Sequence, residues 1–176
     1  PRSNIFDSVL AAFSAEMAID PGTAMTRVFV AGRGVVCAVP SVVAIHEDRE
    51  GFRRVLAVGD EALDMEGRTP PDIRTVRPIV DGTINDFEML EAMLRTLVLQ
   101  VQGRRLWVGP RVAIAVPYGT TDVERRALRE SAEASGARSV TIVEKPLCAA
   151  IGAGLPVGDA CGQMVVDVGA GTTTLS

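Results

Sequence analysis

The chain has 176 residues, of which 47% are hydrophobic, and a formal net charge of −4. A chain of this length can bury the core of one domain with a small insertion, and its negative charge argues against electrostatic binding of nucleic acid. One histidine and three scattered cysteines lack metal-ligand spacing, which argues against a structural zinc site. Scattered cysteines of this kind are typical of reduced thiols in the cytoplasm. No run of about 18 apolar residues occurs, so we predict no membrane-spanning helix.

The first predicted element is a short amphipathic helix near the N-terminus. Its apolar face carries Phe6 and Leu10, together with Ile5, Val9 and Phe13. Such a helix either lies in the interface of a lipid bilayer or docks on its own domain, and its polar face carries little positive charge to attract anionic lipid. The pattern alone leaves both alternatives open.

A β-rich region follows this helix. Residues 17–31 predict two strands joined by a tight turn, and Val35–Val39 predicts a third strand. From residue 40 to 78, short apolar runs alternate with charged and proline-rich segments, including a predicted charged loop at 47–54. We interpret residues 40–78 as an inserted subdomain.

Strands alternate with helices in the second half of the chain. Asp86 is placed to cap a helix whose apolar residues recur at three- and four-residue steps from Met89 to Val101. The elements predicted after it are a strand at Val112–Val116, a helix opened by the capping box at Thr121–Glu124, a strand at Val140–Val143 and a helix at Pro146–Gly154. This alternation predicts an α/β fold with a mixed, partly parallel sheet covered by helices.

One short pattern occurs twice in the chain, 147 positions apart. Each copy is an apolar run that ends in Asp-x-Gly and is followed by a hydroxylated residue, which predicts a strand, a tight turn and a returning strand. Glycine lets backbone N–H groups approach an anion, threonine hydroxyls add donors, and an aspartate at each strand end can hold the waters of Mg²⁺. Two such turns predict a phosphate clamp. The matched residues are Asp20 and Asp167, Gly22 and Gly169, and Thr26 and Thr173.

Several segments in family order make the chain recognisable from about residue 14 to its last residue: Asp20-Pro21-Gly22-Thr23-Ala24, Pro40–Ile45, Ala57-Val58-Gly59, Gly67–Pro70, Val123–Ala127, Ala149–Pro156 and Val165-Val166-Asp167. With these segments the chain closely resembles the first half of the MreB family of bacterial actin-like cell-shape proteins. The resemblance implies an actin-like (ribonuclease H-like) ATPase domain. Its expected parts are subdomain IA at 1–39 and 79–158, subdomain IB at 40–78, and the start of subdomain IIA at 159–176.

The same resemblance implies ATP and Mg²⁺ held between two lobes, self-assembly into filaments, and attachment to the inner face of the cytoplasmic membrane beside other cell-shape proteins. The adenosine-binding segments of the family lie beyond Ser176, so we expect weak nucleotide binding by this chain alone. Carried over by position, the metal-side aspartates are Asp20 and Asp167, and the two phosphate turns are Gly22-Thr23-Ala24-Met25 and Gly169-Ala170-Gly171-Thr172.

Two positions are assigned to hydrolysis, Lys145 and Thr172. The family has an acidic residue where Lys145 stands, and that acid positions the attacking water. An ammonium has donors only, so it would bind phosphate oxygens instead of accepting a proton. Glu144 lies one residue earlier, at a strand end, where we expect its side chain to point elsewhere. We therefore expect slow or absent hydrolysis, with Lys145 either clamping phosphate or lying on the surface at a helix start.

Smaller departures from the family lie in the turns themselves. Pro21 removes a backbone donor, and Met25 stands where the family has a polar asparagine. Ala170 replaces a glycine, which costs free energy if that position needs a positive φ. Together with Lys145, these changes favour a degenerate relative over an active filament motor.

A second membrane candidate is the segment Arg104-Arg105-Leu106-Trp107. Tryptophan favours the membrane interface, and in the resembled family an apolar loop at this place inserts into the bilayer. We therefore predict lipid contact by Leu106 and Trp107, the alternative being a tryptophan packed back onto the preceding helix.

Three functions compete on the sequence alone. The first is a nucleotide-binding subunit of a cytoskeletal polymer. The second is a sugar kinase or chaperone-type ATPase of the same superfamily, whose clamp hairpins look alike. The third is a truncated relative that binds membrane or shape proteins without using nucleotide.

Overall fold

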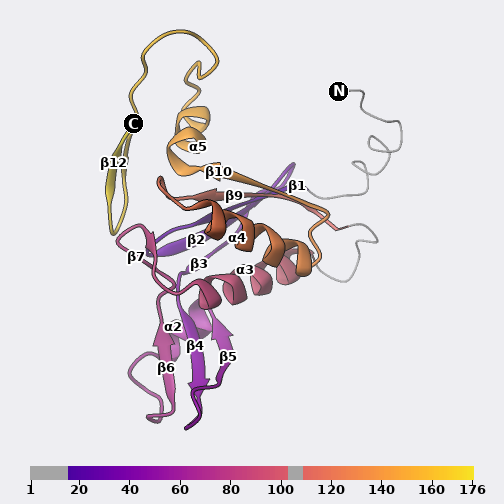
Figure 1. Ribbon diagram of the computed structural model, residues 1–176, viewed down its shortest axis with the longest axis vertical. Coiled ribbons are helices and arrows are strands. Elements are labelled where there is room, and N and C mark those ends of the chain that lie inside the picture. The colour runs from indigo at the N-terminus through magenta and orange to yellow at the C-terminus, as the bar shows by residue number, and fades with distance from the viewer. Residues whose placement is uncertain (1–15, 103–108) are drawn as a thin grey trace.

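The computed structural model describes residues 16–102 and 109–176. Its main sheet contains β1 (Glu16–Pro21), β2 (Met25–Val30), β3 (Gly34–Pro40), β9 (Arg111–Val116) and β10 (Ser139–Glu144). The strand order is β10-β9-β1-β2-β3 (Figure 1). β1, β2 and β3 form an antiparallel meander, whereas β9 and β10 run parallel to β1. The predicted mixed, partly parallel sheet is therefore confirmed.

β1 is the central strand of this sheet, and its alternating sequence suits that place. Met17 and Ile19 point into the core and are 3% and 1% exposed, whereas Asp20 at the end of the strand is only partly covered. On one side Met17 pairs in parallel with Val112 of β9, and on the other Ile19 pairs in antiparallel with Val28 of β2. β1, which is paired on both sides, thus places Asp20 at the end of the sheet where the parallel strands finish.

Two helices, α3 (Phe87–Gln102) and α4 (Asp122–Ala134), lie side by side on one face of the sheet (Figure 1). The predicted cap of α3 is confirmed, because Asp86 Oδ1 accepts the N–H of Met89 at 3.1 Å. The capping box of α4 is also present, with Thr121 Oγ1 and the Glu124 carboxylate each accepting the other residue's N–H. The apolar stripe of α3 is core, although Val101 at its end is only partly buried. Six of its members are at most 1% exposed: Met89, Leu90, Met93, Leu94, Leu97 and Val98.

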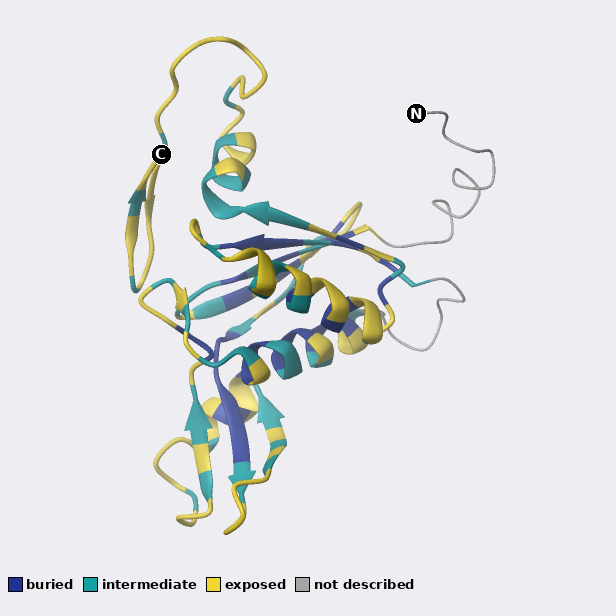
Figure 2. Cartoon of the chain, viewed as in Figure 1, coloured by how far each residue is buried: buried dark blue, intermediate teal, exposed yellow. Residues whose placement is uncertain are grey.

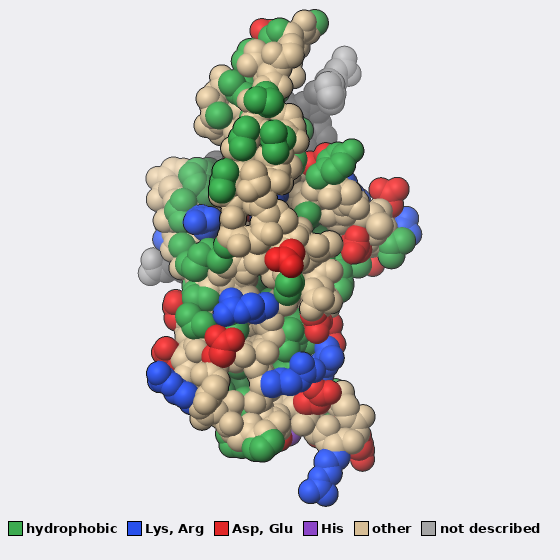
Figure 3. All heavy atoms as spheres, turned by 90° about the vertical axis from the view of Figure 1, so that its left-hand side faces the viewer, with side chains coloured by type: hydrophobic (Ala, Val, Ile, Leu, Met, Phe, Trp, Pro, Cys, Tyr) green, Lys and Arg blue, Asp and Glu red, His purple; other side chains and the backbone are tan. Residues whose placement is uncertain are grey.

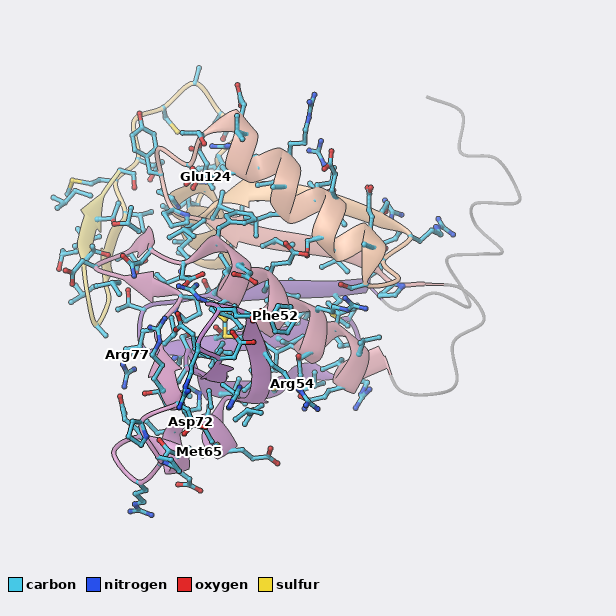
Figure 4. The ribbon with its side chains drawn as sticks, turned by 60° about the horizontal axis from the view of Figure 1, so that its bottom comes forward. Phe52, Arg54, Met65, Asp72, Arg77 and Glu124 are labelled. Carbon is cyan, nitrogen blue, oxygen red and sulfur yellow. The ribbon has the colours of Figure 1, made fainter. Side chains whose placement is uncertain are left out.

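A smaller sheet stands below the main one and has the order β5-β4-β6. It consists of β4 (Val43–Glu47), β5 (Arg53–Val58) and β6 (Ile73–Val76), with the short helix α2 (Asp60–Met65) packed against it. Val42, Ala44 and Ala62 form a small core of its own. Figure 4 shows Met65, the last residue of α2, and Asp72, just before β6, in this part of the molecule, away from Glu124 at the start of α4.

The predicted charged loop at 47–54 is too long by several residues. β4 continues through Glu47 and β5 begins at Arg53, so the loop covers only 48–52. It is closed by Asp48, whose carboxylate accepts the N–H groups of Glu50 and Phe52. β6 has no counterpart among the predicted strands, because four alternating residues after a proline pair carry little periodic signal.

The remaining elements are short. They are the hairpin β7 (Ile79–Val80) and β8 (Thr83–Ile84), the helix α5 (Lys145–Gly152), and the hairpin β11 (Val166–Val168) and β12 (Thr173–Leu175). Figure 2 shows buried residues in the main sheet, in α3 and in β4, whereas the segment after α5 is mostly exposed. Apolar side chains gather at the top of the view in Figure 3, where α5 and the segment after it lie, and charges of both signs are interspersed below. Within the described residues, no helix is both long and apolar enough to cross a bilayer.

Candidate functional site

A cavity of about 560 Å³ lies where the parallel strands of the main sheet end. Asp20 in β1, Pro117 after β9 and Lys145 after β10 all line it. The carboxyl ends of parallel strands form the usual ligand crevice of α/β proteins. A smaller hollow of about 290 Å³ at the other end of β1, beside Glu16 and Arg111, contains no glycine turn. We therefore take the larger cavity as the candidate site.

The first turn of the repeated pattern forms one wall of this cavity. The N–H of Gly22 donates to the carbonyl of Met25 at 3.1 Å and closes the turn between β1 and β2. A Cβ at Gly22 would lie 2.7 Å from that carbonyl oxygen, a distance that real side chains do not tolerate. Glycine at this position is therefore required for the backbone to fold so tightly.

The second turn of the pattern forms another wall, and its geometry repeats the first. The N–H of Gly169 donates to the carbonyl of Thr172 at 2.8 Å and closes the turn between β11 and β12. A Cβ at Gly169 would lie 3.1 Å from the Thr172 oxygen. The sequence repeat is thus also a repeat of hydrogen bonding, and both turns face the same cavity.

A third turn, which sequence reasoning missed, contacts both of the others. Asp81 and Gly82 connect β7 to β8 with φ values of 49° and 69°, as a two-residue hairpin turn requires. The N–H of Gly82 donates to Thr23 Oγ1 at 3.0 Å, which ties this turn to the first. A Cβ at Gly82 would lie 2.7 Å from Thr172 Oγ1, so the second turn is close as well. The dipeptide Asp-Gly is the signal that would have found it.

Lys145 faces the cavity and does not lie free on the surface. Its Nζ lies 2.9 Å from Asp20 Oδ1, and its side chain is only 24% exposed. Asp20 Oδ2 is also approached by Arg27 Nη1 at 4.0 Å. The neighbouring Glu144 points elsewhere, as expected, because its carboxylate accepts a 2.6 Å bond from Arg125. The first-turn aspartate is therefore paired with cations of the chain itself.

Cys148 lies one turn further along α5, where burial and the charge of Asp20 affect the pKa of its thiol. Burial raises the pKa of the Cys148 thiol, and the nearby Asp20 carboxylate raises it further. The thiol is half-buried on α5. It is not among the residues that line the cavity.

The predicted phosphate-turn residues, the two aspartates and Lys145 come together around one cavity. Phe6, Leu10, Leu106 and Trp107 lie outside the described residues. The predicted residues found in the cavity lining are Asp20, Gly22, Thr23, Ala24, Met25, Lys145, Asp167, Gly169, Ala170, Gly171 and Thr172.

Two details of the predicted turns are corrected by the structure. Thr26 offers no donor to the cavity, because its buried hydroxyl is hydrogen-bonded to Ser41 Oγ at 2.9 Å. Ala170 carries no left-handed strain, since Asp81 is the only non-glycine residue with a positive φ in the described parts of the chain.

The magnesium ion implied by the resemblance meets an unsuitable set of donors. In residues 16–102 and 109–176, no three His, Cys, Asp or Glu side chains group closely enough to hold a metal ion. Of the two expected aspartates, Asp20 is already paired with Lys145, while Asp167 lies in β11 and lines the same cavity. Mg²⁺ and its water shell need oxygen acceptors that are not neutralised by an ammonium. The residues at Asp20 therefore do not fit the metal.

Comparison with known proteins identifies the family. A family model described as "MreB/Mbl protein" matches residues 14–176. The chain belongs to the MreB/Mbl family. The cell shape-determining protein MreB of Escherichia coli is 51% identical over 166 residues, which cover 93% of this chain and 48% of that protein. This MreB/Mbl chain thus spans about half the length of the curated relatives it matches.

Solved structures confirm the actin-like fold. MreB5 of Spiroplasma citri, crystallised with AMPPNP, matches with a TM-score of 0.75 and 36% identity over 92% of this chain and 48% of that one. MamK in a double helical filament matches with a TM-score of 0.70 over 92% of this chain and 49% of that one, and at 24% identity it supports the fold alone. The fold predicted from the sequence is confirmed.

Proposed function

We propose that this chain forms the nucleotide-binding half of a cell shape-determining cytoskeletal protein, with the phosphates of ATP held between the first and second turns. One observation carries the proposal: Gly22 and Gly169 make the same closing hydrogen bond on two walls of a single cavity. Such turns direct backbone N–H groups towards an anion. The AMPPNP bound to MreB5 supports this choice of ligand.

The subdomain assignment belongs to the same proposal. The five-stranded sheet with its helices corresponds to subdomain IA at 1–39 and 79–158. The three-stranded sheet corresponds to subdomain IB at 40–78, and the hairpin of β11 and β12 to the start of IIA at 159–176. The separate small core of the three-stranded sheet supports this division.

Nucleotide binding by the two turns is the first part of the proposal, and measuring nucleotide affinity tests it. Gly22→Ala introduces a Cβ 2.7 Å from a backbone oxygen, whereas a Cβ at Gly158 would meet nothing within 4 Å. In the full gene product we expect AMPPNP to bind about tenfold more weakly to Gly22→Ala, and with unchanged affinity to Gly158→Ala. Equal affinity of the wild type and both variants would remove the first turn from the site. No binding by the wild type would favour the alternative of a nucleotide-independent membrane or shape-protein ligand.

Slow hydrolysis is the second part of the proposal. The position of the family's acid holds Lys145, which has no acceptor for the proton of an attacking water. Glu144 cannot take over this role while Arg125 holds its carboxylate at 2.6 Å. Phosphate release by the wild type should be close to background, and Lys145→Glu should raise it. A wild type that releases phosphate as fast as Lys145→Glu would contradict this part.

Self-association into filaments is the third part, supported by membership of the MreB/Mbl family. The test is pelleting of the full gene product by ultracentrifugation with and without AMPPNP. Assembly that increases with nucleotide is the expected result. A protein that stays in the supernatant at every concentration would contradict it.

Attachment to the inner face of the cytoplasmic membrane, beside other shape proteins, is the fourth part. It rests on the apolar residues Phe6, Leu10, Leu106 and Trp107 in the sequence. Sedimentation with anionic vesicles should carry the wild type down and leave a Leu106→Ser/Trp107→Ser variant largely in solution. A variant that sediments fully would contradict lipid contact by Leu106 and Trp107 and would assign it to Phe6 and Leu10.

A further inference from the structure

Lys145 is the only lysine in the sequence, because the other seventeen basic residues are arginines. It is the first residue of α5, directly after the parallel strand β10, and its side chain extends into the cavity. Three neighbours define its place there: the Asp20 carboxylate, the first turn and the N-terminal end of its own helix. The single lysine therefore lies where the aspartate, the first turn and the N-terminus of α5 meet.

The ammonium lies against the phosphate turn as well as against the aspartate. Nζ is 2.9 Å from Asp20 Oδ1 and 3.9 Å from the point that a Cβ on Gly22 would occupy. A phosphate oxygen bound by the first turn would therefore come within reach of the same ammonium. The Lys145 ammonium would then lie between Asp20 and the phosphate and interact with both. In a site with carboxylates only, a metal ion would have to take this place.

The charges around the cavity agree with this arrangement. Its described lining contains three carboxylates, Asp20, Asp81 and Asp167, and two cations, Arg27 and Lys145, which leaves a net charge of −1. With an acid in place of Lys145 the net charge would be −3, and a divalent ion would be needed before a polyphosphate could enter. Lysine removes that need and repels a second cation from the same place.

We propose that the Lys145 ammonium acts as a built-in counter-ion of the nucleotide phosphates, so that the cleft binds nucleoside triphosphate without Mg²⁺. The inference rests on the proposed nucleotide site and specifies the form of the ligand. An ammonium suits this role better than a guanidinium does, because it is a compact point charge with three donors. It can donate to Asp20 and still have donors for phosphate oxygens.

The test is the affinity for AMPPNP in the full gene product, measured by calorimetry with excess Mg²⁺ and again with EDTA. For the wild type, the two dissociation constants should agree within about threefold, since no metal contributes to binding. Lys145→Glu should bind at least about tenfold more weakly in EDTA than in Mg²⁺, because it loses a charge-assisted bond and gains a carboxylate. Lys145→Arg keeps the charge and should remain insensitive to Mg²⁺.

A second measurement uses Mn²⁺ as a probe of the nucleotide-free protein by electron paramagnetic resonance. We expect no bound Mn²⁺ in the wild type and a bound fraction in Lys145→Glu. Circular dichroism checks the fold of each variant, and the two wild-type measurements decide the question even if a variant does not fold.

The two kinds of failure are distinguishable. A wild type that binds AMPPNP only with Mg²⁺, or that binds Mn²⁺ on its own, overturns the inference and leaves the proposed function intact. A wild type that binds no AMPPNP under either condition overturns the proposed function, and the inference with it.

Discussion

The two turns of the repeated pattern have the same local geometry but different support. The first turn follows β1, which is paired on both edges and carries the buried side chain of Ile19. The second turn follows β11, all three of whose residues are exposed and whose only partner in the described structure is β12. Both nevertheless close with a glycine N–H bonded to the carbonyl three residues later.

This difference separates what local sequence specifies from what tertiary packing adds. Asp-x-Gly after an apolar strand is sufficient for the shape of the turn, because that shape depends on a few backbone dihedrals. How firmly the turn is held depends on the sheet behind it. The first turn should therefore behave as a rigid wall of the cavity, and the second as a wall of low local stability.

The largest expected contrast is in the stability that each hairpin contributes. Ile19→Ala removes a 1% exposed side chain from the core and should lower the free energy of unfolding by about 2–5 kcal/mol. Val166→Ala changes a side chain that is 51% exposed and should cost no more than about 0.5 kcal/mol. Urea unfolding of the full gene product measures both. Equal losses would mean that the second hairpin is packed as firmly as the first.

The contact between the first turn and the β7–β8 turn gives the next contrast. Thr23→Val removes the hydroxyl that accepts the N–H of Gly82 at 3.0 Å and should cost about 1 kcal/mol of stability. Thr23→Ser keeps the hydroxyl and serves as the control. Amide hydrogen exchange at Gly82 should increase in Thr23→Val alone. Unchanged exchange would mean that this bond does not hold the two turns together.

Substitutions of the two matched aspartates should differ in their effect on stability, but by a smaller amount. Asp20→Asn removes the partner of Lys145, a half-exposed ion pair, and should lower stability by up to about 1 kcal/mol. Asp167→Asn, at the equivalent position of an exposed strand, should leave stability unchanged. Thermal unfolding compares the two variants. A larger loss of stability from Asp167→Asn than from Asp20→Asn would mean that the second turn is held more firmly than the first.

The smallest effect concerns the cysteines beside the two hairpins. Burial, with the Asp20 charge as a second cause, raises the pKa of Cys148, so less thiolate is present at a given pH. Cys161, on the segment that leads to β11, is exposed. Iodoacetamide at mildly alkaline pH should therefore label Cys161 before Cys148, as peptide mass spectrometry would show. Faster labelling of Cys148 would contradict its position beside the first turn.

Much of the fold follows from local patterns in the sequence. The capping box of Thr121 and Glu124, the Asp86 cap and the apolar stripe of α3 depend on neighbours within a few residues, so spacing alone predicts them. β6 and the hairpin of β7 and β8 do not follow in this way, because strands of two to four residues show little periodicity. Only the Asp-Gly dipeptide at 81–82 signals the β7–β8 turn.

The candidate site is predictable in membership but less so in its interactions. The repeat and the family resemblance point to both turns and to Lys145. The ion pair between Lys145 and Asp20 joins residues far apart in the sequence, and only the folded sheet brings β1 and α5 together. Likewise, the buried bond of Thr26 with Ser41 depends on tertiary packing, so the motif does not reveal that this hydroxyl is turned away from the site.

The central place of β1 has a consequence for the order of events during synthesis. Its antiparallel partner β2 follows within a few residues, so the meander through β3 can form as soon as residue 40 has left the ribosome. Its other edge stays unpaired until β9 is made, because Met17 pairs with Val112 of that strand. Non-local parallel pairing is slow, and an open edge is prone to pair with other chains. We therefore expect the docking of β9 onto β1 to set the folding rate, and nascent chains that end before residue 111 to be the most prone to aggregation.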